Sequence, residues 1–126
     1  MIGLTLDDLA TRQAGWLEAR LNAISQNIAN SDTPGYLAKD VKPFTESLEN
    51  NAFQMTATSP LHIGRAQTSS FAIRLRDVPT ADAALSGNTV SVDQEFVRAN
   101  EVRNAYGLNT SIVRAFNRMI MNSLKG

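Results

Sequence analysis

Hydrophobic residues recur at helical spacing near both ends of the chain, whereas the middle shows little periodicity. Near the N-terminus, apolar side chains follow one another at alternating steps of four and three residues, from Ala10 to Ile28. This heptad spacing places them on one face of a helix. Thr5 followed by Asp8 fits a capping box, in which side chains satisfy free amides at a helix start. The pattern predicts a helix from residue 5 to about residue 30.

A second apolar stripe runs from Val92 to Ile120, again at steps of three and four residues. Only Asn109 interrupts its apolar character, and no proline falls within either stripe. Ser91 with Gln94 fits a second capping box, although the nearby Asp93 competes as the cap. We therefore predict a helix from residue 91 to about residue 124.

The segment between the two stripes has a different character. All four prolines of the chain lie between residues 31 and 90, where Ser, Thr, Asn and Gly are dense. The stretch "PFTESLENNAF" favours a short helix, and the alternation in "SSFAIRLRDV" favours a short strand. The sequence thus predicts a mainly α fold. Residues 1–30 and 91–126 form a discontinuous coiled-coil unit, and residues 31–90 form an irregular middle segment.

The predicted helices are too long for a compact globule of this size. At 1.5 Å per residue they extend for about 40 and 50 Å, whereas a compact chain of this length has a diameter of about 36 Å. We expect an elongated molecule whose wide apolar seams leave surface free for interaction. The residues expected in the seam and in subunit interfaces are Ala10, Ala14, Leu17, Leu21, Ile24, Asn27, Ile28, Val92, Phe96, Ala99, Val102, Tyr106, Val113, Phe116 and Ile120.

Three positions inside these helices raise separate questions. Asn27 lies beside the seam, where its amide is expected to bond a neighbouring helix or chain and fix the register. Gly15 and Gly107 each cost about 1 kcal/mol relative to alanine. They indicate either close approach by another backbone or a tolerated weak point.

Composition and charge exclude several classes of protein. Twelve basic and twelve acidic residues cancel, so nothing draws the chain to nucleic acid. The arginines of the second helix share it with acidic residues, which favours a solvated face or interfacial ion pairs. There is no cysteine, and no apolar run approaches the ~20 residues of a membrane span. No Sec-type signal is visible, so work outside the cytoplasm would require another export route.

Candidate catalytic chemistry is sparse. His62 is the only histidine, and no triad or metal-ligand spacing surrounds it. Asp7 and Asp8 are neighbours on a helix and point in different directions, so favourable charge at the helix start is their expected role. No phosphate-binding glycine loop is present. We expect no enzyme activity and no catalytic, cofactor-binding or metal-binding residues.

The stretch "NIANSDTPGY" ends the first helix. Thr33-Pro34-Gly35-Tyr36 suits a type II turn, because proline presets φ at the second position and glycine supplies a positive φ at the third. Asn30 suits a left-handed C-cap. Taken alone, these features predict a well-built helix stop.

The same stretch resembles the N-terminal signature of the flagellar axial proteins, the family of rod, hook and hook-junction proteins. The family core A-N-x-x-T-P-G-Y is matched by Ala29, Asn30, Thr33, Pro34, Gly35 and Tyr36. The final segment, "GNTVSVDQEFVRANEVRNAYGLNTSIVRAFNRMI", is similar to the second hallmark of the family. The pattern GNTV-x-x-D-x-E at the start of this segment resembles one of the family's two sister proximal rod proteins. The other sister protein is the alternative identification.

The resemblance implies a structural component of the flagellar basal-body rod. Its terminal helices pair and stack with those of neighbours into a helical tube that surrounds the export channel and transmits torque. The implied partners are other copies of the chain, other rod proteins, the junction protein FliE, the MS-ring protein and the export gate. It also implies a periplasmic rod location reached through the flagellar type III apparatus without a Sec signal. The turn motif would be a hinge at the tube wall.

Other function classes stay open at this point. A soluble helical adaptor or export chaperone would fold alone and need no polymer, but a proline-rich middle between two long helices does not suit it. An enzyme would depend on His62, and a nucleic-acid binder is disfavoured by the absence of net charge.

Overall fold

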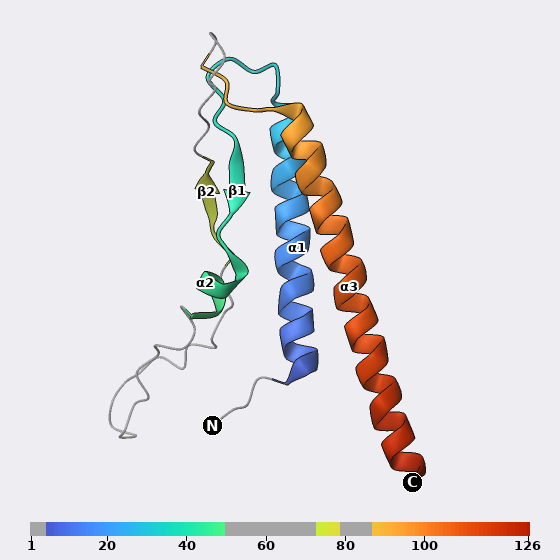
Figure 1. Cartoon of the computed structure of the whole chain (residues 1–126). Helices are drawn as coiled ribbons and strands as arrows, with labels where there is room; N and C mark the ends of the chain where they lie inside the picture. Colours follow the sequence, from blue (N-terminus) through green and yellow to red (C-terminus); the bar gives the residue numbers. More distant parts are fainter. Residues whose placement is uncertain (1–4, 50–72, 79–86) are drawn as a thin grey trace, which may run out of the picture.

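The computed structural model describes residues 5–49, 73–78 and 87–126. Its elements in chain order are α1 (Leu6–Ala29), β1 (Lys39–Val41), α2 (Phe44–Glu49), β2 (Leu75–Asp77) and α3 (Val92–Lys125). The long helices α1 and α3 pack against each other in antiparallel directions (Figure 1). The predicted mainly α fold with paired terminal helices is confirmed.

The start of α1 is fixed by the predicted capping box. The Asp8 N–H donates to Thr5 Oγ1 (3.1 Å), while the Thr5 N–H (3.4 Å) and hydroxyl (2.7 Å) donate to Asp8 Oδ2. These bonds from Thr5 hold the pKa of Asp8 below its usual value of 3.8, with a smaller contribution from the Arg12 charge. The cap therefore favours the ionised carboxylate, which also suits the positive end of the helix dipole.

The start of α3 differs from the prediction. Ser91 is the N-cap residue, but its side chain makes no capping hydrogen bond, so the box with Gln94 is not formed. Asp93 lies within the first turn and is not the cap. The approaching backbone is held instead by Asn88, whose Oδ1 accepts from the Val90 N–H at 2.8 Å. A side chain two residues before Val90 thus organises the helix start.

The end of α1 also corrects one expectation. Asn30 is the C-cap residue, but its φ of −106° and ψ of 16° are not left-handed. Its N–H donates to the carbonyls of Gln26 (3.1 Å) and Asn27 (3.2 Å), and its Nδ2 donates to Gln26 (2.8 Å). These bonds keep Asn30 close to helical geometry. The positive φ comes later, at Gly35.

The described part of the middle segment folds back along α1. Strands β1 and β2 form an antiparallel pair with Lys39 opposite Asp77 and Val41 opposite Leu75. Strand β1 contacts α1, so α1 lies between α3 and the strand pair (Figure 1). Helix α2 and strand β2 fall within the two stretches for which the sequence predicts a short helix and a short strand.

The hydrophobic core lies between α1 and the first part of α3. Leu17, Ile24 and Val102 form its buried centre. The partly buried residues packed against them are Trp16, Ile28, Ala99 and Ala105. Helix α1 has 24 residues and α3 has 34, a difference of ~15 Å in length at 1.5 Å per residue. The C-terminal end of α3 accordingly extends past the start of α1 (Figure 1).

Candidate assembly interface

The family turn motif forms the predicted type II turn at the end of α1. The Tyr36 N–H donates to the Thr33 carbonyl at 3.3 Å, and Gly35 has a φ of 74°. Pro34 and Gly35 are exposed, as are Ala29 and Thr33, whereas Asn30 and Tyr36 are half-buried. The motif is thus a surface feature whose geometry depends on glycine at position 35.

A buried asparagine from the other end of the chain holds this turn. Asn88 is only 5% exposed, and its Nδ2 lies close to three carbonyl oxygens of the turn segment. They belong to Asn30 (3.0 Å), Ser31 (2.7 Å) and Thr33 (2.8 Å). The Asn30 and Thr33 carbonyls also accept backbone N–H groups within the turn, from Thr33 (3.0 Å) and Tyr36 (3.3 Å). Asn88 thus adds a side-chain hydrogen bond to carbonyls that follow a helix end and lack helical partners.

Backbone contacts extend this connection on both sides of Asn88. The Thr89 N–H donates to the Tyr36 carbonyl at 3.0 Å, and the Ala38 N–H donates to Thr89 Oγ1 at 2.8 Å. Gly87 has a φ of 74°, and a Cβ placed on it would lie 3.6 Å from the Cα of Gly35. We call residues 30–38 together with residues 87–90 the turn clasp. It joins the entry to α3 to the exit from α1.

Asn27 connects α1 to the strand pair. Its side chain is fully buried. Its Nδ2 donates to the Lys39 carbonyl at 2.7 Å, and the Lys39 N–H donates to Asn27 Oδ1 at 2.9 Å. The amide therefore pairs with the backbone of β1 as a neighbouring strand would. Sequence reasoning marked Asn27 as a register-fixing amide but expected a helix or another chain as its partner.

Arg20 links α1 to both of its neighbours. Its Nε lies 3.3 Å from Asp40 Oδ1 in β1, and its Nη2 lies 3.4 Å from Glu101 Oε2 in α3. The guanidinium also lies 5.6 Å from the centre of the Trp16 ring. Trp16 in turn donates from Nε1 to the Lys42 carbonyl at 2.7 Å. Sequence reasoning missed this cluster because its members become neighbours only when the middle segment folds back.

A buried carboxylate lies in the first turn of α3. Glu95 is 1% exposed, and its Oε1 lies 2.6 Å from Arg98 Nη1. Among the described residues, its other oxygen, Oε2, is buried without a hydrogen-bond partner. Burying this charge costs free energy that a single ion pair offsets only in part. The ion pair of Glu95 with Arg98 lies within α3 itself.

The predicted seam residues divide into two groups in the structure. Those buried or half-buried are Ala10, Ala14, Leu17, Ile24, Asn27, Ile28, Val92, Ala99, Val102 and Val113. Those exposed are Leu21, Phe96, Tyr106, Phe116 and Ile120. Phe116 and Ile120 lie beyond the part of α3 that runs beside α1, whereas Leu21, Phe96 and Tyr106 are exposed between less exposed positions of the same stripes. Asn109, the polar break in the stripe, donates from Nδ2 to the Ala10 carbonyl at 3.1 Å.

The last part of α3 presents large apolar side chains to solvent. Phe116 and Ile120 continue the seam face and are 38% and 43% exposed. Met119 is 62% exposed and Leu124 is 78% exposed. We call residues 115–125 the α3 overhang. Exposed apolar side chains grouped at one end of a helix make this segment the candidate for contact with a neighbouring subunit.

The described residues offer little for chemistry at a reactive centre. His62 lies outside them. Within them, no group of three or more His, Cys, Asp or Glu side chains is placed to hold a metal ion. None of the described helices is long and apolar enough to cross a bilayer.

Comparisons with known proteins point to the same family as the turn motif. A family described as "Flagella basal body rod protein" matches residues 17–36, which include that motif. The chain is 38% identical to flagellar basal body rod protein FlgB of Agrobacterium fabrum over 97% of this chain and 94% of the relative. FlgB of Salmonella typhimurium is 31% identical over 85% of this chain and 83% of the relative.

A third relative agrees with these two. FlgB of Aeromonas hydrophila is 34% identical over 74% of this chain and 70% of its own length. All three relatives carry the same name, so the sister rod protein FlgC, the alternative left by the sequence, is not favoured. The chain belongs to the FlgB family of flagellar basal body rod proteins.

Proposed function

We propose that this chain is a structural subunit of the proximal rod of the bacterial flagellum, built into the rod through its terminal helices. In this position it transmits torque and surrounds the export channel. Its family makes it a structural rod component, not an enzyme, and makes other basal body components its neighbours. The observation that carries the proposal is the exposed apolar overhang of α3.

The overhang is costly in a chain that works alone. Phe116, Met119, Ile120 and Leu124 are all exposed, and two of them extend the face that packs on α1. Fully burying one such side chain stabilises an assembly by roughly 1.5–3 kcal/mol. A polymer of subunits supplies that burial. A helical protein that stays monomeric would leave the same side chains in water.

The two predicted units have different roles in this proposal. Residues 1–30 and 91–126 form the helical unit that packs with neighbours, and residues 31–90 lie outside the tube wall. The turn motif and Asn88 fix the point where the chain passes from one unit to the other. The clasp hydrogen bonds support this division, because they tie both crossing segments together.

The finer placement rests on family membership. Other copies of the chain, other rod proteins, the junction protein FliE, the MS-ring protein and the export gate are the proposed neighbours. The proposed location is the periplasmic rod, and the proposed route is the flagellar type III apparatus without a Sec signal. Assembly after export would cover the overhang only at the growing rod.

The test replaces the two seam residues of the overhang. In a flagellated host lacking its own copy of the gene, Phe116→Ser with Ile120→Ser should abolish swimming and remove the chain from purified basal bodies, while export continues. Because both side chains are substantially exposed, the free energy of unfolding should change by less than about 1 kcal/mol. The control Asn117→Ser, exposed on the same turn, should swim normally. Normal swimming of the double variant would contradict the proposal.

A further inference from the structure

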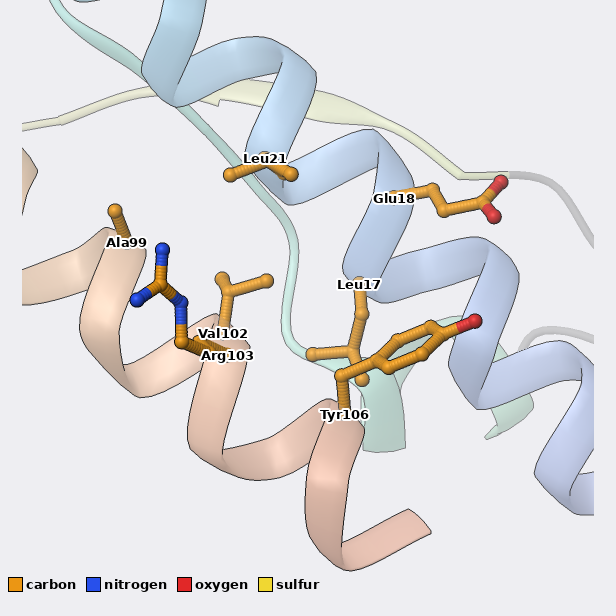
Figure 2. A pocket seen from close by; sticks show the side chains of 7 residues that line it. All are labelled: Leu17, Glu18, Leu21, Ala99, Val102, Arg103 and Tyr106. Atoms are coloured by element: carbon orange, nitrogen blue, oxygen red, sulfur yellow. The ribbon is translucent and has the colours of Figure 1, made fainter. Parts of the chain in front are cut away.

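One side of the α1–α3 pair carries a continuous groove. It consists of two adjoining hollows of about 380 Å³ and 350 Å³, and both are bordered by Tyr106. Leu17, Leu21 and Val102 lie in the first hollow, and Ala10, Ala14 and Val113 lie in the second. Figure 2 shows the first hollow, with Leu17 and Leu21 on α1 and Val102 and Tyr106 on α3. Its floor is therefore mainly apolar.

The groove follows a regular line on each helix. On α1 it is bordered by residues 7, 11, 14, 18 and 21, and on α3 by residues 99, 103, 106, 110 and 114. Both sets advance by steps of four and three, so each forms one straight edge of its helix. The α1 residues that contact residues 39–42, Trp16, Arg20 and Asn27, do not border either hollow. This side is thus separate from the β1 contact.

The two edges carry opposite charges. Asp7 and Glu18 lie on the α1 edge, and Arg103 and Arg114 lie on the α3 edge. Asp7 and Glu18 are eleven positions apart, close to three helical turns, and so are Arg103 and Arg114. Glu18 borders the same hollow as Arg103, and Asp7 borders the same hollow as Arg114. Each acidic residue therefore lies at the same level as a basic one.

These charges are not paired with one another within the chain. None of the ion pairs formed by the described residues joins the two edges. In Figure 2 the Glu18 carboxylate and the Arg103 guanidinium extend from opposite helices and point away from each other. An acidic edge and a basic edge thus border an apolar floor, and both stay available to an approaching surface.

We propose that, in the free chain, this groove closes on the same groove of a second copy to form a parallel, two-fold symmetric four-helix bundle. In that arrangement α1 of one copy lies over α3 of its partner. Since a two-fold axis parallel to the helices preserves the level of each residue, Glu18 meets the partner's Arg103. By the same rule Asp7 meets the partner's Arg114. The pair forms four interchain ion pairs around a shared apolar floor.

The charges select this arrangement over its main competitor. The other face-to-face packing places α1 over α1 and α3 over α3, with the copies antiparallel. That packing sets the acidic edge against the acidic edge and the basic edge against the basic edge. Contacts between like charges are strongly unfavourable, so the charged edges disfavour this antiparallel packing. In the parallel packing all neighbouring helices are still antiparallel, as in an up-and-down bundle.

The inference goes beyond the proposed function and does not depend on it. An isologous contact uses the same patch on both copies and closes, whereas a rod grows through contacts that do not close. The pair is therefore a resting form of the free chain. The α3 overhang does not border either hollow, so the rod test and the dimer test probe different residues.

The first experiment measures self-association of the purified full-length chain by sedimentation equilibrium. Glu18→Arg and Arg103→Glu should each raise the dimer dissociation constant by about tenfold or more, because each places like charges in contact. The double variant Glu18→Arg, Arg103→Glu restores complementarity and should dimerise like the unmodified chain. Asn104→Glu, exposed beside Arg103 but outside the groove, is the control. A chain that stays monomeric, or single variants that dimerise normally, would overturn the inference.

The second experiment uses the absence of cysteine in the chain. Two single-cysteine variants, Glu18→Cys and Arg103→Cys, are mixed and treated with a short bis-maleimide crosslinker. Crosslinks between position 18 and position 103 of different molecules should predominate over crosslinks between like positions. Mixing Glu18→Cys with Asn104→Cys should give few crosslinks between position 18 and position 104. Predominance of 18-to-18 crosslinks would show the α1-over-α1 packing and refute the parallel pair.

Discussion

At the scale of single residues, two asparagine side chains take the place of missing backbone partners. Asn27 exchanges two hydrogen bonds with Lys39, as a strand neighbour does. Asn88 donates to carbonyls that the end of α1 leaves without helical partners. A carboxamide has both a donor and an acceptor in fixed geometry, so it can replace a peptide group. The path of the middle segment therefore depends on a few polar atoms.

Removing one of these amides should have a large effect on stability. Asn27→Ala leaves both the N–H and the carbonyl of Lys39 without a partner in a part-buried position. Each unsatisfied group costs about 1–3 kcal/mol, so we expect a loss of roughly 2–4 kcal/mol in the free energy of unfolding. Urea denaturation followed by circular dichroism measures it. Asn22→Ala, on the exposed side of the same helix, is the control and should shift stability by less than about 0.5 kcal/mol. Equal effects of the two substitutions would count against this role.

Sequence reasoning reached Asn27 but not Asn88, for a physical reason. Asn27 stands out because a polar side chain beside an apolar stripe is unusual, and that signal is local. Its partner, Lys39, lies twelve residues later in the chain, in the irregular middle segment. The partners of Asn88 precede it by 55 to 58 residues, and no local period marks a contact over that separation. The capping box of Thr5 and Asp8 was predictable because both partners lie within one turn.

At the scale of elements, glycine has opposite effects on stability in the helices and in the clasp. Gly35 and Gly87 have a positive φ of 74°, which alanine adopts only with strain. Gly15 lies inside α1, and a Cβ placed on it would meet nothing within 4 Å in the free chain. Of the two interpretations offered by the sequence, the free chain therefore favours a weak point in the helix. Close approach by a neighbouring subunit would appear only on assembly.

Replacing glycine by alanine should thus have opposite effects on the free energy of unfolding at these positions. Gly15→Ala should raise the free energy of unfolding by about 1 kcal/mol, because alanine is the better helix former. Gly35→Ala should lower it by about 1–2 kcal/mol through left-handed strain alone, since no atom lies within 4 Å of the added methyl group. Thermal unfolding of the two variants beside the unmodified chain measures both. Stabilisation by Gly35→Ala would show that the type II turn does not hold in solution.

At the scale of the whole molecule, the helices were predictable and their neighbours were not. Heptad spacing specifies α1 and α3 from local residues, and their lengths alone indicate an elongated shape. The return of β1 along α1 depends on Asn27, Trp16 and Arg20 contacting residues 39–42. These are polar contacts without periodicity. The charged edges of the groove were equally hidden, because they become visible only when α1 and α3 are set in register.

This unequal support along α3 leads to a prediction about its dynamics. In the free chain the first part of α3 packs on α1, whereas the apolar side chains of the overhang, such as Phe116 and Leu124, are exposed. Local opening requires least free energy where few buried apolar contacts hold an element. Amide hydrogen exchange should therefore be slow around Val102 and become faster towards Leu124, with fast exchange over residues 115–125. In isolated basal bodies the same amides should become protected, because neighbouring subunits cover Phe116 and Ile120. Uniform protection of α3 in the free chain would mean that the overhang is already covered before assembly. Unchanged exchange of these amides in basal bodies would mean that the overhang stays uncovered in the rod.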